Sequence, residues 1–419
     1  MRIAIAGAGI AGLCTAWLLD PVHEVVVFES QPRIGGHVLT LAVPDGPDGQ
    51  AAVDVGAQHI APGAFRLFSR LLRELRLAAQ TFDVPLSTTL MHHPYSTPLL
   101  VSPHASSSDR ARSTILGDEW AAVGRLVSGA AEWAAEDNSW ATPLSELIEP
   151  LPVTREHKDM LLYPLLASFF GCDTTQVKET SARAATAFLI AVPPATDDDA
   201  PVWHNLHTGL GAVAGALAAQ LERGRIRTDL GVKLLRRVGD QVEVTDSAGR
   251  SHTVDRIVLA THPDEAARVI APLPGTDRLV DALNTFTYVD VLVAAHTDPA
   301  YMPPNRRHWS TNNVTVHDGW AETSTWYGAA GVDVFKSWVT HRDRPPRKPV
   351  AQASFRQLCL TPAAVRARPQ VIAAQGEGGV HFAGHHLHHL DSQESALASA
   401  VDVARTLAPA APRLERLLK

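Results

Sequence analysis

Residues 1–40 read MRIAIAGAGIAGLCTAWLLDPVHEVVVFESQPRIGGHVLT, and this stretch decides the fold. A short apolar run, residues 2–6, is followed at once by glycines at positions 7, 9 and 12 and then by the helix-forming residues 13–19. This order predicts a β-strand, a tight turn and an α-helix, which together open a βαβ nucleotide-binding unit. At the helix N-terminus, free backbone N–H groups and the helix dipole favour the negative charge of a pyrophosphate.

A second predicted strand, residues 24–28, ends at Glu29, roughly 20 residues after the first glycine. A carboxylate at this spacing suits hydrogen bonding to ribose hydroxyls, and its charge would repel the 2′-phosphate of NADP. A glycine-rich turn alone is a weak signal, but the strand, the helix and the acid together predict a bound nucleotide. The residues that we expect to contact it here are Gly7, Ala8, Gly9, Ile10, Ala11, Gly12, Glu29 and Ser30.

The next segment, RIGGHVLT at residues 33–40, resembles the RxGGRxxT motif that follows the ribose-binding acid in the flavin amine oxidase superfamily. The resemblance implies FAD as the cofactor. It also implies that Gly35 and Gly36 let the backbone pass close to the pyrophosphate, with Arg33 and His37 beside it. His37 stands where the family usually has arginine, so we expect a weaker or pH-sensitive phosphate contact.

Two further segments carry the same resemblance. DVGAQHI at residues 54–60 is similar to the DxGAxxx segment that passes the isoalloxazine ring, which implies flavin contacts from Gly56, Ala57, Gln58 and His59. Residues 202–221 resemble the family's aromatic lead, paired glycines and long helix. After them, the resemblance implies that Val232 holds the adenine through its backbone and that a closing parallel strand ends at Thr261.

Near the C-terminus, residues 378–384 (GGVHFAG) and 392–400 (SQESALASA) resemble the family's FAxGE…EGAxxSG segment. The resemblance implies a strand that reaches the pyrophosphate. It also implies a helix N-terminus that points at the flavin pyrimidine, which gains negative charge on reduction. A histidine replaces the usual acid at 385, and a serine replaces a glycine at 395. The residues expected to contact FAD here are Gly384, His385, Glu394, Ser395 and Ala396.

The resemblance implies an α/β fold, with an FAD-binding Rossmann-like domain of the glutathione-reductase type and a second, α+β substrate domain. We expect the FAD-binding domain to be discontinuous and to comprise residues 1–62, 202–270 and 371–419. Residues 63–201 and 271–370 would then form the substrate-binding or cap domain.

Length and composition agree with such an organisation. The chain has 419 residues, 45% of them apolar, which is enough for two domains with sizeable cores. Its 37 basic and 44 acidic residues are dispersed and give a net charge of −7, which argues against nucleic acid or an anionic membrane as a partner. We expect a small-molecule substrate, no membrane span, no signal peptide and a monomer or homodimer. Three widely spaced cysteines without a CxxC or Cys/His pattern favour a cytoplasmic protein.

Polar groups near the flavin ring are the candidates for catalysis. In well-studied amine oxidases a lysine that reaches flavin N5 through water begins the strand that aligns here with residues 288–296, and Asp290 takes its place. Residues 296–303, with Trp309 and the asparagines that follow, resemble a pattern of FAD-binding bacterial proteins of this superfamily. The catalytic candidates are His59, His385 and Asp290, and the candidates for an aromatic wall beside the flavin are Trp203, Trp309, Trp326 and Tyr327.

The histidine run at 385–389 invites a metal interpretation. Adjacent histidines seldom converge on one ion, however, and the run overlies the expected flavin site, so we expect no metal. The alternatives for this run are a group beside the flavin that acts on substrate and a structural loop.

The predicted activity is removal of a hydride from a C–N or C–C bond of a small molecule to flavin N5, with the flavin reoxidised by oxygen or another acceptor. The missing lysine also suits a redox-neutral double-bond isomerase or a desaturase acting on an unsaturated, acyl or biosynthetic substrate. A non-catalytic flavin-binding protein is the third hypothesis, because residues 37, 290, 385 and 395 depart from the family's pattern.

Overall fold

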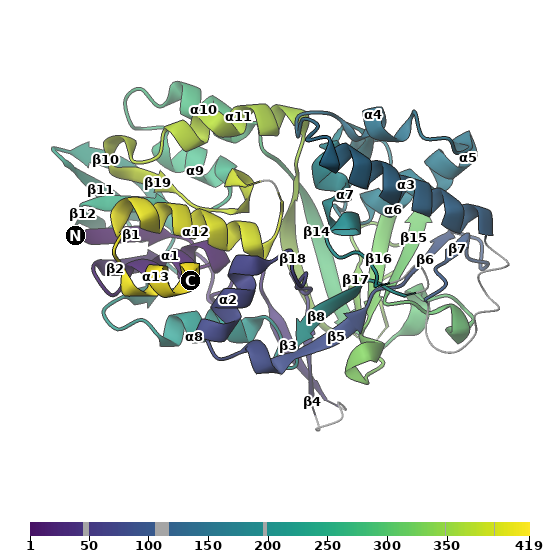
Figure 1. Cartoon of the computed structure of the whole chain (residues 1–419). Coiled ribbons are helices and arrows are strands. Elements are labelled where there is room, and N and C mark those ends of the chain that lie inside the picture. The colour runs from purple at the N-terminus through teal and green to yellow at the C-terminus, as the bar shows by residue number, and fades with distance from the viewer. Residues whose placement is uncertain (45–49, 105–116, 196–198, 348, 389) are drawn as a thin grey trace.

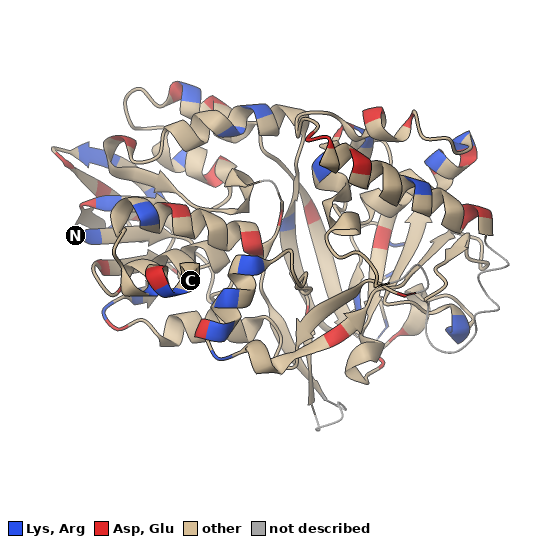
Figure 2. Ribbon diagram, viewed as in Figure 1, with Lys and Arg blue, Asp and Glu red and all other residues tan. Residues whose placement is uncertain are grey.

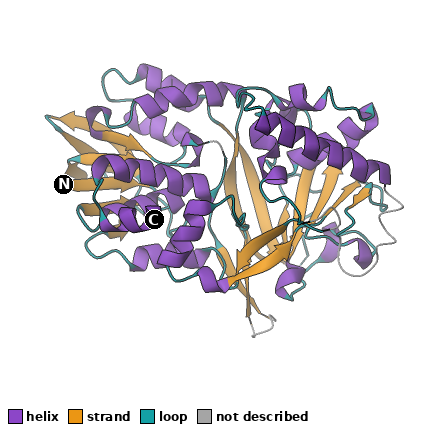
Figure 3. Cartoon of the chain, in the orientation of Figure 1, coloured by secondary structure: helices purple, strands orange, loops and turns teal. Residues whose placement is uncertain are grey.

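The structure is a computed structural model, and it describes residues 1–44, 50–104, 117–195, 199–347, 349–388 and 390–419. Figure 1 shows two parts side by side, with both chain termini in the same part. Each part combines strands with helices, as Figure 3 shows, so the molecule is a mixed α/β protein.

The part that holds the termini is built on a five-stranded sheet in which all neighbouring strands are parallel. Its strands come from distant segments of the chain. In spatial order they are β19 (Val380–Phe382), β13 (Arg256–Leu259), β1 (Arg2–Ala6), β2 (Glu24–Phe28) and β9 (Arg225–Arg227). Helix α1 (Ile10–Leu19) is buried along its whole length because it packs between this sheet and helix α12 (Gln393–Leu407).

The expected strands 2–6 and 24–28 are confirmed. Helix α1 begins three residues earlier than the pattern of helix formers indicates, at Ile10 rather than residue 13. Strand β9 pairs in parallel with β2 and stays separate from the antiparallel meander that follows it in the chain. That meander consists of β10 (Val232–Val238), β11 (Gln241–Asp246) and β12 (Ser251–Val254).

The second part is built on a seven-stranded sheet. In spatial order its strands are β18 (Pro349–Cys359), β14 (Thr287–His296), β17 (Phe335–Trp338), β16 (Trp320–Trp326), β15 (Asn312–His317), β6 (Thr88–His92) and β7 (Leu100–Val101). Helices α3 (Gly117–Ala135), α4 (Leu144–Ile148), α6 (Tyr163–Ala167) and α7 (Ala182–Ile190) share one apolar core with this sheet. Neighbouring strands are antiparallel, except that β6 and β15 are parallel.

Two strand pairs connect the parts. Strands β3 (Thr40–Pro44) and β4 (Gln50–Asp54) form one ladder. Strands β5 (Thr81–Pro85) and β8 (Val202–Leu206) form the other. The residues that follow β4 and lie in β8 therefore stand between the two large sheets, where a site shared by both parts is expected.

The division of the sequence at residues 62, 270 and 371 assigns three helices to the substrate domain, but they pack against the FAD-binding side. Helix α2 (Arg66–Glu74) places Phe68, Leu71 and Leu72 in the core that contains α1. Helices α10 (Asp277–Asn284) and α11 (Pro362–Ala373) share a second core with β13 and β19. Amphipathic spacing alone does not show which sheet such a helix covers. The division stays a proposal, with these three helices packed against the FAD-binding side.

Charged groups of both signs are interspersed over the helices in Figure 2. None of the helices in the described residues combines the length and the apolar character needed to cross a membrane.

Candidate active site

The turn between β1 and α1 depends on glycines. Gly7 has a φ of +100°, and a Cβ there would lie 2.5 Å from the carbonyl oxygen of Ala260. A Cβ on Gly12 would lie 2.0 Å from the carbonyl oxygen of Gly7. Gly9 caps α1 without a side-chain hydrogen bond, so the first N–H groups of the helix are not satisfied by a cap. An uncapped N-terminus above a glycine turn is suited to an anion such as a pyrophosphate.

Glu29 lies beside this turn, as its spacing predicts. Its Oε2 accepts a hydrogen bond of 2.7 Å from the N–H of Ala8, and its Oε1 accepts one of 2.8 Å from the N–H of Gln31. The Ser30 hydroxyl lies 3.4 Å from the same Oε1. Val232 begins β10 next to Ser30, because a Cβ on the preceding glycine would lie 3.1 Å from the Cβ of Ser30. The structure thus brings the expected ribose and adenine contacts together.

The second glycine motif packs directly on the first. The N–H of Gly35 donates to the carbonyl oxygen of Ala8 at 2.7 Å, and a Cβ on Gly36 would lie 3.0 Å from the Cα of Gly9. The guanidinium of Arg33 approaches the carbonyl oxygens of Ile34 and Val38 at 3.4 Å. Backbone therefore passes backbone closely here, which leaves N–H groups rather than side chains at the surface of the turn.

The surroundings of His37 show whether this site can accommodate FAD. Its Nε2 is buried and has no hydrogen-bond partner, which fits a ligand atom at this point. Burial lowers the pKa of His37 to about 4, so the imidazole is uncharged at neutral pH. It therefore does not supply the positive charge of the family's arginine. The ring lies between those of His262, Phe355 and His385, with centroids 5.5, 5.6 and 6.2 Å away.

The residue after Gly384 forms a buried ion pair. The Nδ1 of His385 meets the Oδ1 of Asp391, and the other carboxylate oxygen accepts a hydrogen bond of 2.5 Å from Gln357. Burial lowers the pKa of His385, but Asp391 more than offsets this effect, and the net pKa is raised. The carboxylate of Asp391 therefore favours the protonated form of His385.

The other described histidines of the run face different partners. His386 lies under Gly384, where a Cβ would be 2.5 Å from its ring, and packs against Phe286. His388 pairs with Asp402 at 3.0 Å. His389 lies outside the described residues. Thr261 follows β13 beside the glycine turn, with its methyl group 3.6 Å from the position of a Cβ on Gly7.

Glu394, at the start of α12, has a different role from the one that the resemblance implies. Its carboxylate accepts hydrogen bonds of 2.9 and 2.7 Å from the N–H groups of Leu67 and Phe68, so it caps helix α2. The N–H of Ser395 donates to the Ser392 hydroxyl at 3.2 Å, and Ala396 lies one residue further into the helix. Only backbone groups at this helix end are then left for a flavin.

His59 belongs to a buried polar cluster between the two parts. Its Nδ1 lies 2.8 Å from the side-chain amide of Asn205, and its Nε2 lies 2.6 Å from the amide of Gln58. Its carbonyl oxygen accepts a hydrogen bond of 2.7 Å from Gln393, which links it to the start of α12. Burial lowers the pKa of His59 to about 4, so the ring is neutral.

Lys336, in β17, joins this cluster from the opposite sheet. Its Nζ donates to the carbonyl oxygen of Gly56, and to the Oε1 of Gln58 at 2.8 Å. Burial lowers the pKa of Lys336 to about 8, although Asp54 partly offsets the effect. Sequence reasoning missed this residue. The available signal was a lone lysine between aromatic residues in the apolar segment VFKSWV, residues 334–339.

Asp54 and Tyr327 complete the contact between the parts. Burial raises the pKa of Asp54 to about 6, and its carboxylate accepts hydrogen bonds from the Thr40 hydroxyl and from the N–H of Leu210, the latter at 2.9 Å. The Tyr327 hydroxyl donates to the carbonyl oxygen of Asp54 at 3.0 Å. These bonds hold the segment of residues 54–59 against the seven-stranded sheet.

Asp290 does not join the cluster. Its side chain is 90% exposed and lies 3.9 Å from the guanidinium of Arg356. Ala295 is the cross-strand partner of Lys336, and Asp290 is five residues before it in β14, so Asp290 and Lys336 are on opposite faces of the sheet. Of the three catalytic candidates, only His59 and His385 are buried next to expected cofactor contacts.

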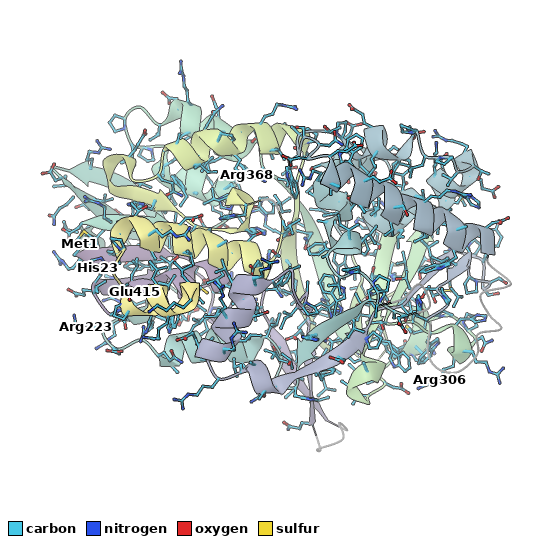
Figure 4. The ribbon with its side chains drawn as sticks, viewed as in Figure 1. Met1, His23, Arg223, Arg306, Arg368 and Glu415 are labelled. Atoms are coloured by element: carbon cyan, nitrogen blue, oxygen red, sulfur yellow. The ribbon has the colours of Figure 1, made fainter. Side chains whose placement is uncertain are left out.

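A small pocket of about 10 Å³, the space of about one water molecule, adjoins His59. Trp326 and Tyr327, two of the expected aromatic wall, line it, whereas Trp203 lies behind His59 with ring centroids 6.2 Å apart. Trp309 packs on Trp326, and the Arg306 guanidinium lies over both rings. Figure 4 shows Arg306 far from Met1 and His23, on the side of the seven-stranded sheet. The lining residues are His59, Phe82, Val84, Asn205, Thr311, Thr325, Trp326, Tyr327, Ala329 and Ala330.

A parallel sheet, a glycine turn with an acid at the end of the second strand, and a second sheet closing over the turn define a class, the two-domain FAD-binding proteins. The model of one family, described as flavin containing amine oxidoreductase, matches residues 10–297. The chain belongs to this family, and its cofactor is FAD.

Known proteins support the fold but not one reaction. A 15-cis-phytoene desaturase of Synechococcus elongatus is 37% identical over 78 residues, which are 18% of this chain and 15% of that protein. The curated relatives match this chain over less than half of their own length. A fatty acid isomerase of P. acnes is 14% identical with a TM-score of 0.68, over 97% of this chain and 98% of that one. Cyclohexylamine oxidase of Brevibacterium oxydans is 17% identical with a TM-score of 0.63, over 97% and 99%.

Proposed function

We propose that this oxidoreductase removes a hydride from a C–N or C–C bond of a small, apolar substrate bound beside His59. The observation that carries the proposal is the lining of the small pocket next to His59, which joins aromatic and aliphatic side chains to a few uncharged polar groups. Bound FAD supplies the hydride acceptor, flavin N5. The chain supplies the position of the substrate and the charge around it.

We propose that the residues of the two glycine motifs and the segments facing them hold the cofactor. Backbone N–H groups at the start of α1 would bind the pyrophosphate, and Glu29 would bind the ribose hydroxyls. The proposed contacts are Gly7, Ala8, Gly9, Ile10, Ala11, Gly12, Glu29, Ser30, Arg33, Gly35, Gly36, His37, Gly56, Ala57, Gln58, His59, Val232, Thr261, Gly384, His385 and the backbone of 394–396.

The polar cluster sets the charge beside the substrate cavity. Lys336 is half protonated near pH 8, so it can hold or release a proton in the physiological range. His59 stays neutral and is held by Gln58 and Asn205, so it offers the substrate an uncharged ring. None of the described residues that line the cavity is a carboxylate, so the lining does not favour a cationic substrate.

A second function is favoured by the same lining. An uncharged, apolar cavity suits a carbon chain as well as a neutral amine, so a desaturase or a redox-neutral double-bond isomerase is the alternative. In the isomerase the hydride would return to another carbon, whereas a desaturase or oxidase passes the electrons to an acceptor. A non-catalytic flavin-binding protein is the third proposal, because the residues at 37 and 385 differ from those of the family's pattern.

The experiment is anaerobic mixing of the yellow, FAD-loaded protein with an apolar primary amine and, separately, with a polyunsaturated fatty acid. Loss of flavin absorbance, with hydrogen peroxide formed after air is admitted, supports the oxidase. A shifted double bond without oxygen uptake supports the isomerase.

A matched pair of variants tests where the substrate binds. Val84→Ile narrows the small pocket and should slow turnover, while dithionite still reduces the flavin. Val238→Ile, at a position that is 48% exposed, should behave like the wild type. If both variants turn over substrate equally, the substrate does not bind in this cavity.

We also propose a cytoplasmic protein that is a monomer or homodimer. All three cysteines are buried and free, which suits a reducing compartment. Size-exclusion chromatography with light scattering tests the assembly.

A further inference from the structure

Three potential metal ligands meet at one end of the seven-stranded sheet. Strands β6, β15 and β17 run in the same direction, because β6 and β15 are parallel and β16 is antiparallel to both β15 and β17. His93 follows the end of β6, His317 ends β15, and Asp343 lies in the loop after β17. Their side chains therefore come from three separate elements to one place, away from Lys336 at the start of β17.

The spacing of the donor atoms fits one metal ion. The Nε2 of His93 lies 3.3 Å from the Oδ2 of Asp343, and the Nε2 of His317 lies 3.1 Å from the Oδ1. One ligand atom from each residue lies within 4.8 Å of the other two. Zinc bonds of about 2.0–2.1 Å in a tetrahedron place ligand atoms about 3.3 Å apart. The separation of each imidazole from the carboxylate thus matches the edge of such a tetrahedron, and all three ligand atoms lie within reach of one ion.

The backbone on both sides of the histidines is held in place. The N–H of His93 donates to the carbonyl oxygen of Val316 at 2.8 Å. His317 pairs with Trp320 across a turn whose middle residues, Asp318 and Gly319, have φ of 46° and 82°. The two imidazoles are therefore fixed relative to each other by the β6–β15–β16 ladder.

The carboxylate is positioned by the two residues before it. His341 stacks on Trp320 with ring centroids 3.6 Å apart. Arg342 forms a buried ion pair with Glu322 at 3.4 Å, each side chain only 6% exposed. Asp343 directly follows these two residues. Its backbone is therefore already held in place before an ion binds.

The ligand set identifies the kind of ion. Two imidazole nitrogens and one carboxylate oxygen suit Zn²⁺, whereas Mg²⁺ and Ca²⁺ prefer sites made of oxygen atoms. The three side chains are 31–49% exposed, so an ion can enter from solvent. A fourth position is left for water or for Asp318, whose carboxylate lies 3.7 Å from the Nε2 of His317.

We propose that His93, His317 and Asp343 bind one Zn²⁺, which ties together the ends of three elements of the substrate-side sheet. The site is independent of the flavin and of the proposed reaction. The expectation of no metal concerned only the histidine run at 385–389. No sequence pattern indicates the present site, because its three ligands are far apart along the chain and show no ligand spacing. Only the parallel run of β6, β15 and β17 brings them together.

Calorimetric titration of the FAD-loaded, full-length protein with ZnCl₂, after dialysis against a chelator, tests the proposal. We expect one equivalent of Zn²⁺ to bind and the melting temperature to rise. MgCl₂ and CaCl₂ should give no response. His317→Gln and Asp343→Asn keep the side-chain size and should each weaken Zn²⁺ binding at least tenfold, and the flavin spectrum reports whether each variant is folded.

His388→Ala is the matched control. His388 also pairs with an aspartate, at 3.0 Å, but outside the three-residue cluster, so this variant should bind Zn²⁺ like the wild type. Unchanged Zn²⁺ affinity in folded His317→Gln and Asp343→Asn, or no binding by the wild type, would overturn the proposal.

Discussion

Lys336, and not the aligned Asp290, lies in the polar cluster beside residues 56–59. The aligned position, Asp290, is exposed on the opposite face of the sheet, while Lys336 is buried against Gly56 and Gln58. A buried ammonium raises the electrostatic potential around it much more than an exposed one, because the protein interior screens charge weakly. Its charge therefore acts on whatever lies beside the segment of residues 56–59.

Replacing Lys336 with methionine should lower the reduction potential of the bound flavin. The variant loses a positive charge that favours the more negative, reduced cofactor, and a loss of about 1.4–3 kcal/mol corresponds to about 30–60 mV for two electrons. Since the pKa of Lys336 is about 8, the difference from wild type should be full below pH 8 and disappear above it. Potentiometric titration from pH 6 to 10 measures this.

The exposed Lys233→Met is the control and should leave the potential unchanged. A Lys336→Met effect that does not depend on pH would point to a structural change rather than to the charge.

Glu29 should decide how tightly FAD binds. Glu29→Gln replaces a buried carboxylate that would accept ribose hydroxyl protons, and charge-assisted hydrogen bonds are worth about 1.5–3 kcal/mol. We expect the dissociation constant of FAD to rise about 10–100-fold. Titration of the apoprotein with FAD, followed by fluorescence quenching, measures it. Glu24→Gln, at the exposed start of the same strand, should change it little.

At the scale of elements, close backbone contact is the device that holds the site together. A Cβ on Gly56 would lie 1.8 Å from the carbonyl oxygen of His37, so Gly56→Ala must push apart two segments that flank the expected flavin. We expect a loss of about 2–3 kcal/mol of stability and weaker FAD binding. Gly215→Ala, in helix α8 (Gly211–Ala219) with no atom near the added Cβ, should instead gain about 0.5–1 kcal/mol. Urea unfolding compares the two.

Helix α2 depends on a residue far away in the sequence. Glu394→Ala removes the carboxylate that accepts from Leu67 and Phe68, and loss of such a cap costs about 1–2 kcal/mol. Glu415→Ala, on the exposed face of helix α13 (Pro412–Leu418), is the control and should change stability by less than about 0.5 kcal/mol. Equal unfolding free energies for both variants would show that the cap contributes nothing.

Elements that obey local rules were predictable, whereas those defined by packing were not. Strands β1 and β2 and the glycine turn after β1 follow from apolar runs and glycines within 30 residues, and the structure confirms them. The roles of Lys336 and Gln393 depend on which segments the fold brings opposite them, and no local pattern contains that information. The same reason explains why Glu394 was assigned to the flavin although its carboxylate caps α2.

The whole molecule should lose stability in acid because several histidines are buried without charge. Burial lowers the pKa of His37 and of His59 to about 4 and that of His262 to about 3, from 6.5. As the pH falls below 6.5, the unfolded chain takes up protons that the folded chain does not. Each histidine then costs about 3 kcal/mol by pH 4, and the three together approach the whole stability of a typical domain.

Urea unfolding between pH 5 and 8 tests this, with a steep loss of the unfolding free energy expected below pH 6.5. The His385–Asp391 pair acts in the opposite sense, since the pKa of His385 is raised. The contribution of this pair to the unfolding free energy is complete below pH 6.5, and it is lost as the pH rises through the pKa of His385 in the folded protein. His59→Gln should make the unfolding free energy fall less steeply with decreasing pH, by a slope that corresponds to at most one proton. Stability that does not change from pH 7 to 5 would contradict the prediction.

The strand order β19-β13-β1-β2-β9 has a consequence for how the protein is made. On the ribosome, Arg2–Ala6 emerges about 250 residues before its neighbour Arg256–Leu259, and the edge strand Val380–Phe382 emerges later still. Helix α1 meanwhile lacks α12, which covers its apolar surface. The nascent chain therefore has to be shielded from aggregation until synthesis is nearly finished, and flavin capture follows translation rather than accompanying it.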